Sequence, residues 1–128
     1  MSDFNSLHNR AVWFDIPVSD LGRAAEFYRA VLGVKVDDVD TGGYKFCVIE
    51  HTDGNGGCLV PNAKEISGSA GILLYMNVDG RIRDAVAKTP GKGGKVLEPT
   101  HGIGPHGFRA IVLDSEGNRI ALHSSTDA

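Results

Sequence analysis

The chain has 128 residues, a length typical of one compact domain with a substantial buried core. Its slightly acidic net charge of −3 excludes the strongly basic surface of a nucleic-acid-binding protein, so we expect no nucleic-acid partner. No apolar run approaches the roughly 18 residues that a membrane-spanning helix needs, and the start of the chain lacks the apolar core of a signal peptide. We therefore expect a cytoplasmic protein with no membrane partner.

The first part of the chain predicts one helix and four strands. Asp20 fits a helix N-cap, apolar residues at a period near 3.6 predict a helix over 21–32, and Gly33 ends it. Pro17 favours an edge position or irregular pairing for the strand before the helix. An Asp-Gly-Asn-Gly turn joins the last two strands. The predicted strands cover residues 11–18, 34–36, 44–50 and 57–60.

The second part predicts the same order of elements. Asp79 is the expected N-cap of its helix, and Thr89-Pro90-Gly91 ends that helix early. The predicted helix covers residues 81–88, and the predicted strands cover 72–78, 95–98, 108–113 and 119–124.

The two parts are internal repeats. Residues 12–20 resemble residues 72–80, and residues 51–58 resemble residues 114–121 at an offset of 63. Both parts therefore have the order βαβββ, which predicts one α+β domain built from two tandem modules. The expected boundaries are module one at about 9–61, a linker at about 62–70 and module two at about 71–125, within a single domain over 1–128.

The longest irregular stretch is expected over residues 99–107, which hold two prolines and three glycines. Such a loop either closes over a binding site or is an ordinary surface loop, and both interpretations stay open. We expect its His101 and His106 to be solvated, because no cysteine or carboxylate cluster accompanies them as metal ligands.

Two cysteines, Cys47 and Cys58, flank the predicted hairpin turn. The sequence leaves open whether they are neighbours across the strand pair. Without a secretion signal, free thiols are expected rather than a disulfide. We expect Cys58 to be an inert packing group, since a nucleophilic thiol needs a base that lowers its pKa.

Three motifs carry a resemblance to a known superfamily. They are Val18-Ser19-Asp20-Leu21 before the first helix, Phe27-Tyr28 with Leu32-Gly33 within and after it, and Asp114-Ser115-Glu116-Gly117-Asn118-Arg119-Ile120 near the end. In this order the chain resembles the vicinal oxygen chelate superfamily, which includes glyoxalase I, extradiol dioxygenases, fosfomycin-resistance enzymes, methylmalonyl-CoA epimerase and bleomycin-resistance proteins. Within it, residues 13–18 and 117–124 are most similar to predicted enzymes related to lactoylglutathione lyase. The resemblance implies a glyoxalase-like fold, an open, curled mixed sheet with a ligand on its concave face, and commonly a homodimer.

The metal enzymes of this superfamily use four inward positions, two on the first strands of the modules and two on the last. The matching residues here are Trp13, Cys58, Leu73 and Ala121. Trp, Leu and Ala supply none of the lone pairs that a divalent ion needs, and one thiolate does not hold a metal alone. We therefore expect no metal and no other cofactor, and none of the superfamily's usual metal-dependent mechanisms.

Strand alternation turns one set of side chains toward the same face as these four positions. This face is aromatic and aliphatic with a few polar groups, which suits a small organic ligand. Trp13 either stacks on a planar ligand or fills the space of the missing metal. Arg109 is expected on either face of its strand, and on the inward face it would meet an anionic ligand group. The expected ligand-binding residues are Trp13, Cys58, Leu73, Tyr75, Asn77, Arg109, Arg119 and Ala121.

Asp15 and His123 are the candidate catalytic residues, because they are the inward pair that resembles an acid and a base. The alternative is that Asp15 pairs locally, for example with Arg119, and that His123 lies at an exposed strand end. The sequence therefore favours a metal-independent glyoxalase/bleomycin-resistance-like protein that binds a small organic molecule. Two alternatives remain: a lyase or isomerase related to lactoylglutathione lyase that uses Asp15 or His123, and a dimeric interaction module.

Overall fold

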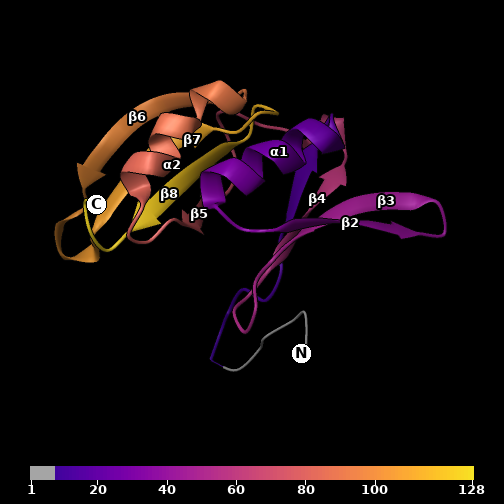
Figure 1. The fold of residues 1–128 in the computed structure, drawn as a ribbon, viewed down its shortest axis with the longest axis horizontal. Helices are drawn as coiled ribbons and strands as arrows, with labels where there is room; N and C mark the ends of the chain where they lie inside the picture. Colours follow the sequence, from indigo (N-terminus) through magenta and orange to yellow (C-terminus); the bar gives the residue numbers. More distant parts are fainter. Residues whose placement is uncertain (1–7) are drawn as a thin grey trace.

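The computed structural model describes residues 8–128, which form two successive groups of one helix and four strands (Figure 1). The first group consists of β1 (Asp15–Val18), α1 (Leu21–Leu32), β2 (Val36–Thr41), β3 (Tyr44–Ile49) and β4 (Gly57–Pro61). The second consists of β5 (Leu74–Asn77), α2 (Ile82–Lys88), β6 (Lys95–Gly102), β7 (Phe108–Leu113) and β8 (Arg119–Ser124). Short 3-10 helices lie at Ala63–Glu65, Pro90–Lys92 and Gly104–His106. Within this described part, no helix has the length and apolarity needed to span a bilayer.

The strands form two four-stranded sheets of the same topology. The first sheet has the order β1-β4-β3-β2 and the second the order β5-β8-β7-β6. In each, the first strand of the module pairs in parallel with the last, and the other pairs are antiparallel. The predicted α+β fold of two tandem βαβββ modules is confirmed, and β1, which contains Pro17, lies at a sheet edge as predicted.

The two helices pack against each other at the centre of the molecule, with one sheet on either side (Figure 1). Helix α1 begins after Asp20, whose carboxylate accepts a hydrogen bond from the Arg23 amide at 3.0 Å, and ends at Gly33 in the left-handed conformation. One face of each sheet is buried against this layer, through residues such as Ile16 in β1 and Leu122 in β8. The opposite face of each sheet carries no helix, and we call it the helix-free face.

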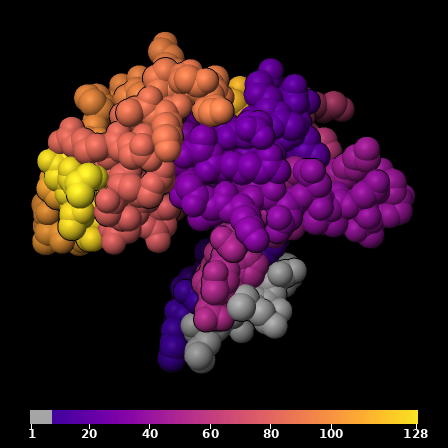
Figure 2. All heavy atoms as spheres, in the orientation of Figure 1, coloured from indigo at the N-terminus to yellow at the C-terminus, as the bar shows by residue number. Residues whose placement is uncertain are grey.

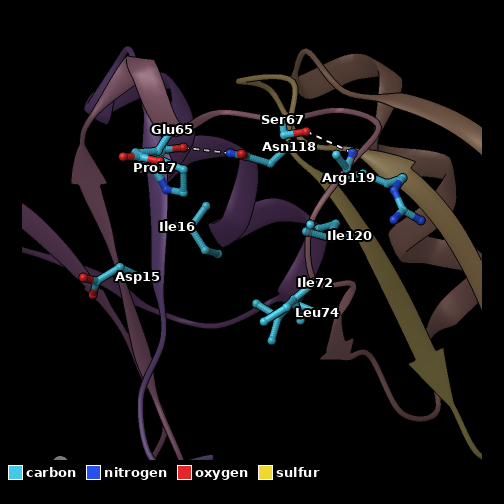
Figure 3. A pocket seen from close by; sticks show the side chains of 12 residues that line it. Asp15, Ile16, Pro17, Glu65, Ser67, Ile72, Leu74, Asn118, Arg119 and Ile120 are labelled. Atoms are coloured by element: carbon cyan, nitrogen blue, oxygen red, sulfur yellow. Dashed lines mark hydrogen bonds between the residues drawn. The ribbon is translucent and has the colours of Figure 1, made fainter.

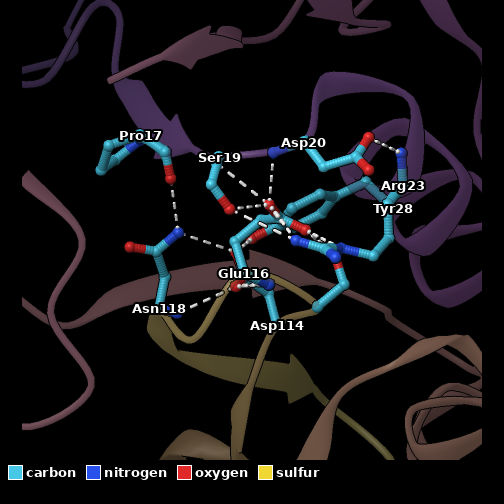
Figure 4. Close-up of polar contacts among 9 residues, drawn as sticks. Pro17, Ser19, Asp20, Arg23, Tyr28, Asp114, Glu116 and Asn118 are labelled. Carbon is cyan, nitrogen blue, oxygen red and sulfur yellow. Dashed lines mark hydrogen bonds and ion pairs between the residues drawn. The ribbon is translucent and has the colours of Figure 1, made fainter. Parts of the chain in front are cut away.

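A loop of module two holds the two modules together along the seam visible in Figure 2. Glu116 Oε1 accepts hydrogen bonds from the backbone amides of Ser19 and Asp20 at 3.0 and 2.8 Å, and Arg23 Nε donates to its Oε2 at 2.7 Å (Figure 4). The start of helix α1 is therefore capped by a carboxylate from the other module.

Next to this carboxylate lies a second, buried contact between the modules. The Tyr28 hydroxyl donates to Asp114 Oδ2 at 2.6 Å, and Asn118 Nδ2 donates to the Pro17 carbonyl at 2.7 Å (Figure 4). Burial, together with the neighbouring Asp114 carboxylate, raises the pKa of Tyr28 well above its ordinary value. The loop over 114–118 thus has a structural role in joining the modules.

Several predicted boundaries differ from the observed ones. The strand predicted at 34–36 begins at Val36 and runs to Thr41, where Gly42 and Gly43, with φ of 60° and 89°, form the turn into β3. Its Val-Asp-Asp-Val-Asp-Thr sequence is mostly polar because β2 is an edge strand with an exposed side. Strands β1 and β5 are shorter than predicted at their starts.

The loop prediction over 99–107 is wrong for its first half. Residues 99–102 continue β6, and the rest forms the 3-10 turn Gly104–His106, closed by a hydrogen bond from the Ile103 amide to the Gly107 carbonyl at 2.9 Å. Pro99 is tolerated because β6 is an edge strand, and the register shifts on both sides of Glu98 absorb the irregularity.

Asp79 does not cap the second helix. Helix α2 begins at Ile82 after Arg81, which makes no side-chain cap. The Asp79 carboxylate instead accepts hydrogen bonds from the backbone amide and hydroxyl of Ser125, at 2.5 and 2.6 Å. It thereby fastens the segment after β8 rather than the helix start.

Candidate ligand-binding site

The helix-free face of the second sheet carries a pocket of about 660 Å³. This volume is within the range of small-molecule sites. Strands β5, β7 and β8 and the 3-10 turn after β6 form its walls, so every lining residue belongs to module two. The lining residues are Tyr75, Met76, Asn77, Ile103, His106, Arg109 and His123.

The strand register places a row of polar side chains across the second sheet. Asn77 is opposite His123, His123 is opposite Arg109, and Arg109 is opposite His101. Paired residues share a face of a sheet, so these four side chains, one from each strand, form a line. We call them the polar row. The next row toward the sheet centre contains Tyr75, Ala121 and Ile111 and is largely apolar.

Arg109 is the centre of the polar row. Its Nη1 donates a hydrogen bond to the Tyr75 hydroxyl at 2.5 Å, and its Nε donates to His101 Nε2 at 3.1 Å. Among the residues that the structure describes, no carboxylate lies within ion-pair distance of this guanidinium. Arg109 is half-buried, so the pocket contains a positive charge that the described chain does not neutralise.

The two histidines of the polar row each contact a backbone carbonyl. His101 Nδ1 lies 2.9 Å from the Pro99 carbonyl, and a carbonyl only accepts, so Nδ1 donates and Nε2 is left to accept from Arg109. His123 Nε2 donates in the same way to the His106 carbonyl at 2.7 Å. This second bond fixes the 3-10 turn beside the pocket.

The helix-free face of the first sheet contains Asp15 and Cys58. They are opposite each other in the parallel pair β1–β4, and the Cys58 thiol donates to Asp15 Oδ1 at 3.1 Å. Burial, followed by this hydrogen bond, raises the pKa of Cys58 to about 11, although a hydrogen bond with Trp13 acts in the opposite direction. Cys58 is therefore a protonated thiol at neutral pH, not a nucleophile.

A groove of about 390 Å³ lies between the two modules (Figure 3). Ile16 of β1 and Ile120 of β8 face each other across it, whereas Asp15 points outward on one side and Arg119 outward on the other. Asp15 and Arg119 do not form an ion pair in the described part of the chain. The two helix-free faces therefore point in opposite directions.

This arrangement separates the residues that the sequence grouped into one cavity. Asp15, Trp13 and Cys58 lie on module one, and Tyr75, Asn77, Arg109 and His123 lie on module two. Asp15 is bonded to Cys58 and His123 to the His106 carbonyl, so within one chain the structure does not bring the acid and the base together. Their proposed catalytic role remains a prediction.

Comparison with known proteins agrees with this architecture. Residues 10–50 match the family model for the N-terminal part of bleomycin resistance protein-like proteins. A hypothetical protein from S. aureus superposes with a TM-score of 0.71 at 19% identity, covering 91% of this chain and 94% of the other. The fosfomycin resistance protein FosX from Listeria monocytogenes superposes with a TM-score of 0.68 at 10% identity, covering 92% and 94%. The chain has the vicinal oxygen chelate fold.

A longer protein with the same fold is a glyoxalase I variant from Zea mays. It superposes with a TM-score of 0.69 at 20% identity, covering 88% of this chain and 45% of the other. No curated protein sequence matches the chain. The family match and the structural neighbours together confirm the resemblance to the vicinal oxygen chelate superfamily.

The residues at the four metal-ligand positions of the vicinal oxygen chelate fold do not fit a metal ion. Leu73 and Ala121 have no donor atoms, Cys58 holds its proton through burial and Asp15, and the Trp13 indole stacks edge-on against His51 at 5.9 Å between ring centroids. Within residues 8–128, no group of three His, Cys, Asp or Glu side chains is placed to bind one.

The sequence did not identify three residues of the site. His101 and His106 were expected to be solvated. His106 is exposed, as expected, and it also lines the pocket, as does Ile103, whereas His101 lies half-buried on β6 beside Arg109. The alternation of β6 could have placed His101 there only if residues 99–102 had been recognised as a strand. Pro99 and Pro105 made this stretch look like a loop in the sequence.

Cys47 and Cys58 lie on neighbouring strands, which the sequence left open. Cys47 is opposite Leu59, and Cys58 is opposite Val48, so the two thiols point to opposite faces of the first sheet. Both are free and buried, as expected.

Proposed function

We propose that this protein binds a small organic molecule, without a metal ion, in the pocket on the helix-free face of its second sheet. The observation that carries the proposal is a pocket of about 660 Å³ with an aromatic and aliphatic wall and one Arg109 side chain held in place by Tyr75 and His101. Few, fixed polar groups in a mostly apolar pocket are typical of small-molecule sites. The lack of donor atoms at Leu73 and Ala121 supports metal independence.

We also propose that two copies of the chain pair, so that the helix-free face of module one in one copy covers the pocket of module two in the other. Two observations support this arrangement. The pocket is lined by module two alone, and the helix-free face of module one points away from it. Apolar side chains are also exposed beside these faces, with Ile72 94% and Tyr75 45% accessible, which is typical of surfaces that are covered by a partner.

Such a dimer would place Asp15 and Trp13 of one copy near His123 of the other. Reaction chemistry by a lyase or isomerase depends on that pairing, because within one chain Asp15 and His123 have separate partners. We propose binding as the function, since it does not require the pairing.

The proposal is tested by screening chelator-treated protein with ligand-observed NMR against a metabolite panel of aromatic and aliphatic acids, amides, amines and alcohols. We expect saturable binders whose affinity falls at least about tenfold in Tyr75→Ala, because the ring forms a pocket wall. Leu97→Ala is the matched control, since Leu97 is a similarly exposed apolar side chain, 40% against 45%, that does not line the pocket. A panel without saturable binders, or binders equally affected by both substitutions, would contradict the proposal.

A further inference from the structure

We infer that the ligand of the module-two pocket is a monoanionic carboxylate with a flat apolar body, held at its carboxylate by Arg109 and Asn77. The inference rests on the proposed function and names the class of molecule that the same pocket takes. It follows from the charge of the polar row, from the hydrogen-bond donors that this row leaves unused, and from the shape of the remaining walls.

The pocket contains one positive charge without a described counterion. Arg109 is half-buried, and its described neighbours are a tyrosine hydroxyl and an imidazole, both neutral partners. A guanidinium that is partly removed from water without a counterion is unfavourable, and an anionic ligand would relieve this cost. Its two neutral partners hold the guanidinium plane in place but leave its charge uncompensated.

Two residues of the polar row have hydrogen-bond donors without a described partner. Arg109 donates Nε–H to His101 and one Nη1 hydrogen to Tyr75. Both Nη2 hydrogens are left without a described partner. Asn77 Oδ1 accepts from the Asp79 amide at 2.8 Å, so its Nδ2 is left as the donor. A guanidinium edge and an amide at two places in one row fit the two oxygens of a carboxylate.

The charges around the pocket favour a ligand with a single negative charge. Arg109 is the one arginine or lysine among the lining residues. Glu98 Oε1 lies 4.0 Å from His101 Nε2, at the end of the row, and opposes a second negative charge there. One fixed positive charge with an acidic residue nearby favours a carboxylate over a phosphate dianion.

The walls beside the polar row fit an apolar ligand body. Tyr75 and Ile103 provide an aromatic and an aliphatic wall beside the polar row. An aromatic or other flat apolar group can lie along these two side chains while its carboxylate reaches Arg109.

Isothermal titration calorimetry with three matched probes tests the inference: 1-naphthylacetate, 1-naphthylacetamide and 1-naphthylmethylamine. We expect the acid to bind at least about tenfold more tightly than the amide, and the amine to bind most weakly. Equal affinity of acid and amide would overturn the inference and leave the proposed function standing. Absence of binding by all three would overturn it as well, and the metabolite panel then shows separately whether the proposed function holds.

Single substitutions test whether Arg109 and Asn77 cause the preference for the acid. Arg109→Met should abolish the preference for the acid over the amide, whereas Arg83→Met, at an exposed arginine of α2 paired with Asp127, should retain it. Asn77→Asp keeps the acceptor for the Asp79 amide but replaces the donor by a negative charge, so it should reduce acid binding by about tenfold or more while amide binding changes less. Circular dichroism and thermal unfolding check that each variant is folded. Retention of the full preference in both folded site variants would overturn the inference.

Discussion

At the scale of single residues, the two cysteines show how the sheet surroundings determine thiol chemistry. Cys47 donates to Asp38 at 3.2 Å and Cys58 donates to Asp15 at 3.1 Å. Burial is the main cause that raises the pKa of Cys47 to about 12 and that of Cys58 to about 11, and the neighbouring carboxylates act in the same direction. A thiol that donates to a carboxylate is stabilised in its protonated form.

We therefore predict that neither cysteine of the native protein reacts with Ellman's reagent within minutes at about pH 8, because the thiolate is scarce and access is blocked. Both should react at once in denaturant. Absorbance of the released thiolate measures this directly. Fast stoichiometric labelling of one thiol in native protein, assigned with Cys47→Ser and Cys58→Ser, would contradict the assigned hydrogen bonds.

The sequence predicted free thiols and an inert Cys58, but not the position of Arg109 in the site. The sequence does not predict which face of the sheet carries the Arg109 side chain, because the strand of its partner His101 contains Pro99 and a shifted register. Strand alternation correctly placed Asp15 and His123 each on the helix-free face of its own sheet, but not in one common cavity. Alternation assigns a face within a sheet, however, and says nothing about the direction in which that face points in the molecule.

At the scale of elements, helix α1 depends on a carboxylate from the other module. The Glu116 side chain is fully buried against Arg23, which is half-exposed at 49%. Burial raises the pKa of Glu116, but hydrogen bonds from Arg23, the Asp20 amide, Ser115 and Ser19 outweigh it and lower the pKa from 4.5 to about 2. The folded state therefore favours the charged carboxylate more than the unfolded chain does.

We predict that Glu116→Gln lowers the free energy of unfolding by roughly 2 kcal/mol near neutral pH, since it removes the charge that Arg23 and the helix start bind. The difference from wild type should be full above pH 4.5 and shrink as the pH falls toward about 2, where the native carboxylate is protonated. Urea unfolding over a pH series measures it. The matched control is Glu26→Gln, at a glutamate 62% exposed and paired with Arg29, which should change stability little. A pH-independent difference for Glu116→Gln would contradict this role.

Elements with strong local signals were predictable. The helix over 21–32 has an N-cap, an apolar stripe and a terminal glycine, and it is observed with these bounds. Strand β2 was predicted too early and too short, and the second half of β6 was missed, because edge strands expose one side and tolerate polar residues and proline. The Asp79 cap failed because the repeat copies the sequence of module one but not the contacts, and Ser125 is the partner in module two.

At the scale of the whole molecule, the internal repeat predicts the fold but not the relation between the modules. Their helices pack together at the centre, so the helix-free faces look outward on opposite sides. Which faces meet depends on tertiary contacts such as Tyr28 with Asp114, which join residues far apart in sequence. The sequence pattern contains no information on that geometry.

The outward faces lead to a prediction of assembly. We expect sedimentation equilibrium to give about twice the chain mass of 13.6 kDa at micromolar concentration. Ile72→Asp should shift the equilibrium toward monomer, because it puts a charge on a side chain that is 94% exposed in one chain. A protein that is monomeric at all concentrations would contradict the proposed pairing.

We propose that the vicinal oxygen chelate fold of this protein binds an organic ligand without a metal ion. The most direct test is calorimetric titration of chelator-treated protein with 1-naphthylacetate, repeated after addition of Zn²⁺, Ni²⁺, Mn²⁺ or Fe²⁺. We predict saturable binding with the same affinity in every case, because Leu73 and Ala121 stand where metal ligands would be needed. Binding that appears only after the protein has taken up one ion per chain would contradict the claim.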